Sequence, residues 1–342
     1  MNITFMLGNG FDINMGLKTS YPEFLRHYLA QPKKNDVLER FRQSINAELP
    51  NWTDVEIAIG RCTRDFFGDT ASEDFMACYD DLYDSLAAYL SEQEATAEAL
   101  PEQTLRKGMV WALNHWREGF RSGRMQAIEE RLAACPGEFI YHFITFNYTR
   151  TIDACIAASR AADLGSRMTI HGDFPNQMGK AVHVHGYTDK DMILGVNDES
   201  QLGNPQLLMD RMAFERDRIV KQKANRLFEE GTDELAHSVL SQSDLVYIYG
   251  MSLGKTDKLW WQRLGQLLAT KPHVQVIIYA HDAPEDDLHY SRFLAFEHEL
   301  QRRLLGYCGI VPDDVISRIH VTGFNIFGKI KDIAREPGAA AE

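Results

Sequence analysis

The sequence predicts an α/β fold with a doubly wound, mostly parallel sheet of the Rossmann type and a helical insertion after the first strand. Apolar runs without polar alternation, as in strands buried on both faces, occur at residues 3–7, 138–146, 244–249 and 274–279. Helical patterns separate these runs, which is typical of parallel sheets. A glycine turn follows the first run, where the first strand connects to the first helix.

Length, charge and cysteine content narrow the class of protein. The chain has 342 residues, enough for a large core in one or two domains. Its net charge is 36 minus 49, or −13, which disfavours nucleic acid as a partner. Because no apolar run approaches the ~20 residues of a membrane helix and the N-terminus lacks a signal-peptide pattern, we expect a cytoplasmic protein without a membrane partner. The five scattered cysteines form no C-x-x-C pair, which excludes a zinc site built from cysteine pairs.

The first strand, residues 3–7, leads into Gly8-Asn9-Gly10. Glycines permit positive φ and let a ligand approach backbone amides closely, as in sites for phosphate or ribose. The dinucleotide fingerprint G-x-G-x-x-G is only partly met, because Ile13 occupies the position of the third glycine. A ligand-binding turn and a plain strand-to-helix turn both fit these residues. Thr19 or Ser20 is predicted to cap a helix that runs to about residue 29.

Residues 36–135 are predicted to form a helical insertion, because a compact fold does not tolerate a structureless loop of this length. The α/β domain is then expected to comprise residues 1–35 and 136–334, and residues 335–342 are expected to form a flexible tail. Trp52, Asp54, Glu56 and Ile57 open one helix of the insertion. They either place an acidic side chain toward a cleft or form a capped helix with a buried tryptophan. The expected helices lie at residues 36–48, 54–67, 72–94 and 102–121.

Strands and helices alternate along the rest of the chain. Residues 211–226 contain six basic and two acidic residues, which we interpret as a solvated helix face. Beyond the long runs, short strands are predicted at residues 167–170, 180–184, 192–194 and 318–321. Helices are predicted at residues 151–162, 206–229, 233–242 and 287–305, after Thr256, and from Phe327.

Polar residues follow several of the predicted strands. Ligands of an open α/β sheet bind past the carboxyl ends of its strands, so these residues are candidates for one crevice. Each also has a purely structural explanation, such as a helix cap or a hydrogen bond to the backbone. Four loops that together offer glycine, amide, hydroxyl and imidazole groups nevertheless predict a site. The residues are Asn9 and Asp12, Asn147 and Thr149, His185, and Ser252.

Several blocks, in order along the chain, resemble the AbiH family. They are GNGFDINMGLKTSYPEF (8–24), NWTDVEIAIG (51–60), FITFNYTRTID (143–153), HVHG (183–186), ILGVND (193–198), YGMSLGKTDKLWW (249–261) and FNIF (324–327). AbiH-like proteins are associated with bacteriophage exclusion by abortive infection. The resemblance therefore implies a role in bacterial defence against phage.

The same loops are more distantly similar to sirtuin-type NAD-binding domains. This similarity implies that Asn147 and His185 are catalytic, with NAD as substrate or ligand and no metal. It also implies a set of cofactor-binding residues. The cysteine pairs of the zinc module in protein-deacetylating sirtuins are absent, so NAD hydrolysis is the interpretation that fits best. The implied cofactor-binding set is Gly8, Asn9, Gly10, Phe11, Asp12, Tyr148, Thr149, Gly186, Gly250 and Ser252.

Cleavage of the bond between nicotinamide and ribose develops oxocarbenium character at the anomeric carbon. Asn147 is expected to position a water molecule or the ribose hydroxyls. His185, with an ordinary pKa near ~6.5, is expected to accept a proton from one of them. Asp12 is expected to orient the glycine loop or balance the developing charge, unless it only caps the first helix.

Two other functions remain open on the sequence. His183 and His185, with His171, Asp173, Asn197 or Asp198, are candidate ligands for a divalent ion in phosphoester hydrolysis. Alternatively, the protein binds a nucleotide without turnover and acts as a sensor. Because an unregulated NAD hydrolase would poison its host, we expect gating by the helical insertion, by homo-oligomer assembly or by a phage-derived trigger.

Overall fold

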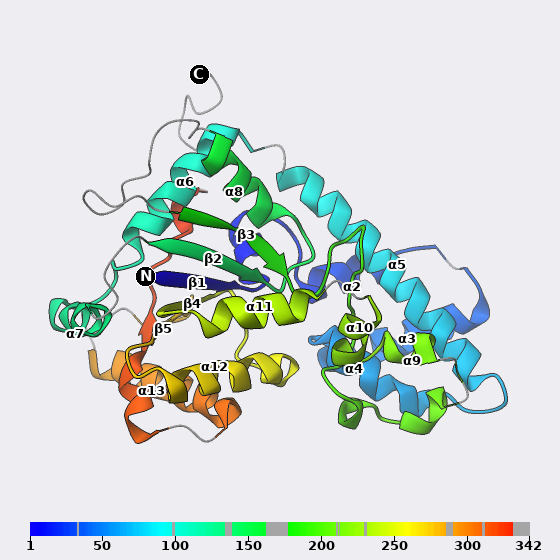
Figure 1. The fold of residues 1–342 in the computed structure, drawn as a ribbon. Coiled ribbons are helices and arrows are strands. Elements are labelled where there is room, and N and C mark those ends of the chain that lie inside the picture. The colour runs from blue at the N-terminus through cyan, green and yellow to red at the C-terminus, as the bar shows by residue number, and fades with distance from the viewer. Residues whose placement is uncertain are drawn as a thin grey trace.

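Six parallel strands form one sheet at the centre of the fold (Figure 1). The computed structural model describes residues 1–32, 34–97, 100–133, 139–161, 177–209, 211, 213–228, 231–284, 290–309 and 312–330. The strand order is β3-β2-β1-β4-β5-β6, the order of the doubly wound Rossmann sheet, which confirms the predicted fold class. The strands are β1 (Asn2–Leu7), β2 (Ile140–Thr145), β3 (Gln177–His183), β4 (Leu245–Tyr249), β5 (Gln275–Tyr279) and β6 (Ile319–Thr322).

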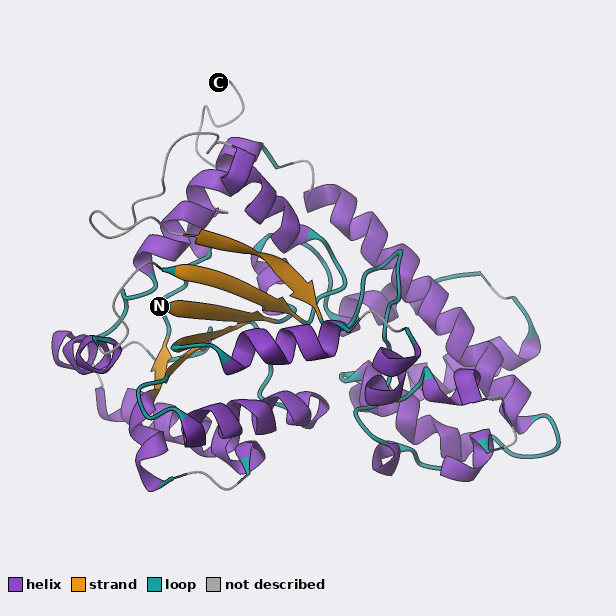
Figure 2. Ribbon diagram, viewed as in Figure 1, coloured by secondary structure: helices purple, strands orange, loops and turns teal. Residues whose placement is uncertain are grey.

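Helices cover both faces of the sheet (Figure 2). Side chains alternate across each strand, so in β1 Phe5 enters one apolar core and Met6 the other. The Phe5 core is closed by α6 (Glu102–His115), α7 (Ser122–Leu132) and α8 (Thr151–Ala161). The Met6 core is closed by α11 (Thr232–Ser241), α12 (Lys258–Thr270) and α13 (Tyr290–Cys308).

A third apolar core lies outside the sheet layers, in a group of helices beside the carboxyl ends of the strands (Figure 1). We call this group the helical lobe. It contains α2 (Tyr21–Leu29), α3 (Asp36–Ala47), α4 (Val55–Cys62) and α5 (Ala71–Ala97), together with residues 192–209, 211 and 213–228, which include α9 (Ala213–Asp217) and α10 (Lys221–Leu227). Two distant parts of the chain therefore build this lobe. A short helix, α1 (Gly10–Asn14), follows β1 directly.

Some predicted helices have different bounds in the structure. Ser20 caps α2 as predicted, by accepting a hydrogen bond from the Glu23 amide. The helix predicted at residues 54–67 ends at Cys62, where the Thr63 hydroxyl donates to the Gly60 carbonyl. The helix predicted at residues 102–121 ends at His115, because the following turn contains a residue of positive φ, Gly119.

The segment after β3 was predicted incorrectly. Residues 192–194 are a loop instead of a strand, and their carbonyl groups accept hydrogen bonds from the hydroxyls of Tyr83, Tyr148 and Tyr79. The helix predicted at residues 206–229 is broken, because Val220 pairs with Val196 and interrupts it. The predicted strand at residues 167–170 and the predicted tail lie outside the described residues.

The helix α5 spans 27 residues and carries acidic side chains along its length. This composition suits a helix that lies on the surface of a globular lobe.

Within the described ranges, no helix combines the length and the apolar character needed to cross a bilayer.

The packing of α12 on α13 gives a test of the fold. A Cβ atom at Gly265 in α12 would lie 2.3 Å from the Cys308 carbonyl oxygen, whereas a Cβ atom at Gly306 in α13 would meet nothing within 4 Å. We expect Gly265→Ala to lower the free energy of unfolding by about 1–3 kcal/mol through overpacking. Gly306→Ala should raise it by roughly 0.5 kcal/mol, because alanine favours the helix.

Urea denaturation followed by circular dichroism would measure both changes. Equal effects of the two substitutions would contradict the close contact between α12 and α13.

Candidate functional site

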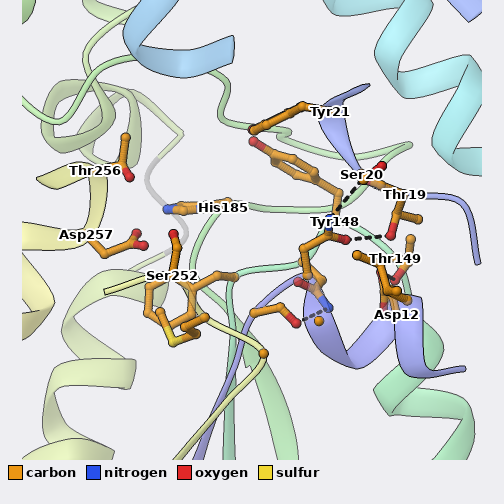
Figure 3. Close-up of a pocket in the computed structure, with 18 of the residues that line it drawn as sticks. Asp12, Thr19, Ser20, Tyr21, Tyr148, Thr149, His185, Ser252, Thr256 and Asp257 are labelled. Carbon is orange, nitrogen blue, oxygen red and sulfur yellow. Dashed lines mark hydrogen bonds between the residues drawn. The ribbon is translucent and has the colours of Figure 1, made fainter. Parts of the chain in front are cut away.

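A cavity of about 690 Å³ lies between the carboxyl ends of the strands and the helical lobe. Loops that follow every strand contribute to its lining, and the lobe contributes residues from α2, α4, α5 and α10. Figure 3 shows His185, Ser252, Thr256 and Asp257 in one part of it and Asp12, Thr19 and Thr149 in another. Its size is typical of small-molecule and cofactor sites, ~300–1,000 Å³. It also adjoins β1, where the strand order reverses and where such sheets bind ligands.

The glycine turn after β1 contacts the loop after β4. The Gly8 amide donates to the Tyr249 carbonyl at 2.9 Å, and the Gly10 amide donates to the Gly250 carbonyl at 2.8 Å. A Cβ atom at Gly10 would lie 2.5 Å from the Cα atom of Gly250, so the absence of side chains lets the two loops touch. The expectation that these amides face a ligand is therefore wrong, because they hold the loops together.

Most of the predicted site residues line this cavity, but Phe11 and Gly186 do not. The Phe11 ring packs in the sheet core against Phe327, with the ring centroids 5.1 Å apart. Gly186, at φ +71°, forms a turn beside a separate cavity of about 40 Å³. The predicted residues that line the main cavity are Gly8, Asn9, Gly10, Asp12, Asn147, Tyr148, Thr149, His185, Gly250 and Ser252.

Asp12 is a buried carboxyl group in the cavity wall, 1% exposed. The Thr149 hydroxyl donates to its Oδ2 at 2.6 Å, while its Oδ1 has no hydrogen-bond partner. Burial raises the pKa of Asp12 to about 7, against the opposing influence of the Thr149 hydroxyl and the Asn147 side chain. Asp12 is not the cap of α1, since that position belongs to Asn9. The side chain of Asn9 is itself held by hydrogen bonds to Thr19.

Asn147 follows β2 and bridges to the glycine turn. Its side-chain Nδ2 donates to the Gly8 carbonyl at 3.2 Å, and its backbone N–H donates to Thr145 Oγ1 at 3.2 Å. The Asn147 carbonyl accepts a hydrogen bond from Nδ1 of His183 at 3.1 Å. The side chain and backbone of Asn147 are therefore both fixed by neighbouring strands and loops.

His185 is buried between aromatic rings. Its ring meets Phe146 edge to face with centroids 5.5 Å apart, and Tyr148 lies on another side. Burial lowers the pKa of His185 well below its ordinary value, and the positive charge of Lys221 lowers it further. The expectation of a pKa near the ordinary value is therefore wrong, and the imidazole is uncharged at neutral pH.

The proposed metal ligands do not come together in the described part of the chain. His183 is directed to Asp153, with Nε2 2.7 Å from Oδ2, and Asp198 caps the turn that follows it. Among the described residues, no group of three or more His, Cys, Asp or Glu side chains is placed to hold a metal ion. His171 and Asp173 lie outside the described residues.

Glu56 and Lys221 form a buried ion pair in the cavity wall, with Lys221 Nζ 2.7 Å from Glu56 Oε2. Burial raises the pKa of Glu56 to about 7, although the charge of Lys221 opposes this shift. Glu56 belongs to the helix for which the sequence allowed two alternatives, an acidic side chain that faces a cleft or a plain capped helix. Lys221 lies in the basic stretch that was interpreted as solvated, and this interpretation is wrong for Lys221, which is 5% exposed.

The comparison with protein families matches residues 4–279 to the family described as bacteriophage abortive infection AbiH. The matched range covers more than half of the 342 residues and runs from β1 to β5. It therefore includes Asp12, Glu56, Asn147 and His185. A search of curated proteins gave no match.

The buried carboxyl of Asp12 should make stability depend on pH. Its pKa is about 7 in the folded protein against 3.8 for an unperturbed carboxyl, so between these values the unfolded chain ionises while the folded protein keeps its proton. The contribution of Asp12 to stability should fall as the pH rises from about 4 to about 7 and then level off. At roughly 1.4 kcal/mol per unit of pKa, the loss amounts to a few kcal/mol.

Asp12→Asn is the comparison, because asparagine does not ionise and the other groups titrate in both proteins. Urea denaturation from pH 4 to pH 8 should show that the free energy of unfolding of the variant, relative to that of the wild type, increases up to pH 7. A difference in stability that does not change with pH would contradict the assignment.

Proposed function

Since this chain belongs to the bacteriophage abortive infection AbiH family, we propose that it is a bacterial defence effector that binds NAD and hydrolyses its bond between nicotinamide and ribose. One observation carries this proposal. The cavity lies at the switch point of a sheet with the dinucleotide-binding strand order, and Asn147, Asp12 and His185 all line it.

The shape of the cavity supports a nucleotide as ligand. Its volume of about 690 Å³ is sufficient for a cofactor-sized molecule. Gly8, Gly10 and Gly250 pack the loops after β1 and β4 against each other at the switch point, and this contact forms one wall of the cavity. The side chain of Tyr148 forms part of the wall and offers an aromatic surface beside His185.

The charges of the cavity favour the cleavage of an N-riboside. Four carboxyl groups (Asp12, Asp54, Glu56 and Asp257) and one lysine (Lys221) are among its lining residues. The transition state carries positive charge on the ribosyl ring, and carboxylates at fixed positions stabilise such a charge. The nicotinamide ring is also cationic before the bond breaks, so this acidic lining matches the reacting half of NAD.

Each candidate residue then has a role. Asp12, buried in the cavity wall, balances the developing positive charge when its carboxyl group is ionised. The amide of Asn147, which the Gly8 carbonyl orients, positions the ribose or the attacking water. Uncharged His185 accepts a hydrogen bond without adding positive charge beside the developing cation. Water adds to the anomeric carbon, nicotinamide leaves with the electron pair of the broken bond, and one proton is released.

Incubation of the purified protein with NAD, with and without a chelator, tests this proposal. We expect release of free nicotinamide and ADP-ribose that the chelator does not change. Asn147→Ala and His185→Ala should each lower the rate by about 100-fold or more, because each removes a group positioned at the reacting carbon. Release would be measured by chromatography.

His298→Ala is the matched control, because His298 is exposed on α13. It should keep the wild-type rate, and circular dichroism should show all three variants folded. Tight binding of NAD without nicotinamide release would replace hydrolysis with a sensor function. Release that the chelator abolishes would favour the metal-dependent alternative.

A further inference from the structure

We propose that Glu56 of the helical lobe is a further catalytic residue, which accepts the proton of the attacking water, and that Lys221 is its positioning partner. This inference rests on the proposed hydrolysis of NAD and assigns the proton acceptor of that reaction. It also makes the site incomplete without the helical lobe, because Glu56 comes from α4 and Lys221 from α10.

Glu56 has an oxygen available to a ligand in the cavity. Its Oε2 is held by Lys221 at 2.7 Å, whereas its Oε1 has only a long contact of 3.4 Å with the Tyr148 hydroxyl. The Tyr148 proton is directed to the Ile193 carbonyl, which lies closer, at 2.9 Å. A hydroxyl has one proton to donate, so Oε1 of Glu56 keeps its capacity to accept a hydrogen bond from water.

The surroundings of Glu56 suit a proton acceptor at cellular pH. Lys221 faces it from α10 and stabilises the ionised form. The carboxyl groups of Asp257 and Asp54 repel a negative charge on it, and burial raises the pKa of Glu56 to about 7. Tyr148 and Tyr21 complete this environment from the loop after β2 and from α2. A base with a pKa near the working pH is the most effective.

The other candidates are less suited to take up the proton. The pKa of His185 lies well below its ordinary value, because it is buried and faces the charge of Lys221, so its imidazole holds an added proton poorly. Asp12 is more deeply buried than Glu56, at 1% against 6% exposed, and one of its oxygens accepts the Thr149 hydroxyl.

The oxygen of water forms a bond to the anomeric carbon, and the bond from that carbon to the nicotinamide nitrogen breaks. Its electron pair leaves with nicotinamide, which becomes neutral. The proton of water passes to Oε1 of Glu56 and then to solvent, so no oxidant, reductant or co-reactant other than water is needed.

The test uses Glu56→Ala and Glu56→Gln in the full-length protein with NAD as substrate. Both should lower kcat by about 100-fold or more, the usual effect of losing a general base, while KM changes little. Added formate should raise the rate of Glu56→Ala at least tenfold, because it supplies a carboxylate in the space that the side chain has left. Formate should not act on Glu56→Gln, in which the space is filled.

Glu199→Gln is the matched control, because Glu199 pairs with Lys223 in the same lobe but on the surface. It should keep the wild-type rate. Lys221→Met should move the rising limb of the pH–rate profile to higher pH, since the charge of Lys221 lowers the pKa of Glu56. The charge of Lys221 also lowers the pKa of His185 and of Asp257, so the shift is assigned to Glu56 by Glu56→Gln, which should abolish the rising limb.

The outcomes separate this inference from the proposed function. Wild-type turnover together with full activity of Glu56→Gln would overturn the role of Glu56 and leave NAD hydrolysis intact. A folded Glu56→Ala variant that is inactive and not restored by formate would assign Glu56 a structural role instead. A wild-type protein that releases no nicotinamide would overturn both.

Discussion

The contact between the loops after β1 and β4 determines where a ligand can bind in this fold. The strand order reverses at β1, so the connections after β1 and β4 diverge to opposite faces of the sheet. Gly10 and Gly250 let the two backbones meet, and two hydrogen bonds between the loops hold them. The cavity opens beside this contact, and Asn147 joins it through the Gly8 carbonyl. The glycines therefore shape the site through packing of the protein itself.

The helical lobe depends on polar contacts between distant segments. Three tyrosine hydroxyls donate to the carbonyls of residues 192–194, which lack strand partners. The pair of Glu56 and Lys221 joins residues separated by 165 positions. The pair therefore links the two parts of the lobe. Removal of one partner from a buried ion pair usually costs about 3–5 kcal/mol of stability, because the other charge stays buried without a partner. The same pair lines the cavity, which couples the integrity of the lobe to the electrostatics of the site.

The sequence predicted the sheet well, because buried parallel strands have a simple local pattern. The central strands are continuous apolar runs, and the polar residues after them converge as expected. The burial of Lys221 was not predictable, because its partner lies far away in the sequence and a basic stretch normally forms a solvated helix face. Residues 192–194 were assigned to a strand because their apolar character is that of one, whereas tyrosines from α5 and the loop after β2 satisfy their carbonyl groups.

Two buried carboxyl groups, Asp12 and Glu56, add an argument for a site at this cavity. A buried acceptor without a partner costs about 1–3 kcal/mol, and an ionisable group without full compensation costs more. In the described residues, Asp12 Oδ1 is the carboxylate oxygen left in this state, and it belongs to a residue of the cavity wall. Glu56, in the same wall, also has its pKa raised by burial. Other unpartnered buried atoms, such as Trp116 Nε1 and Tyr247 Oη, lie in the sheet core, but the two carboxyl groups line the cavity at the switch point, where a ligand or a reaction can make use of them.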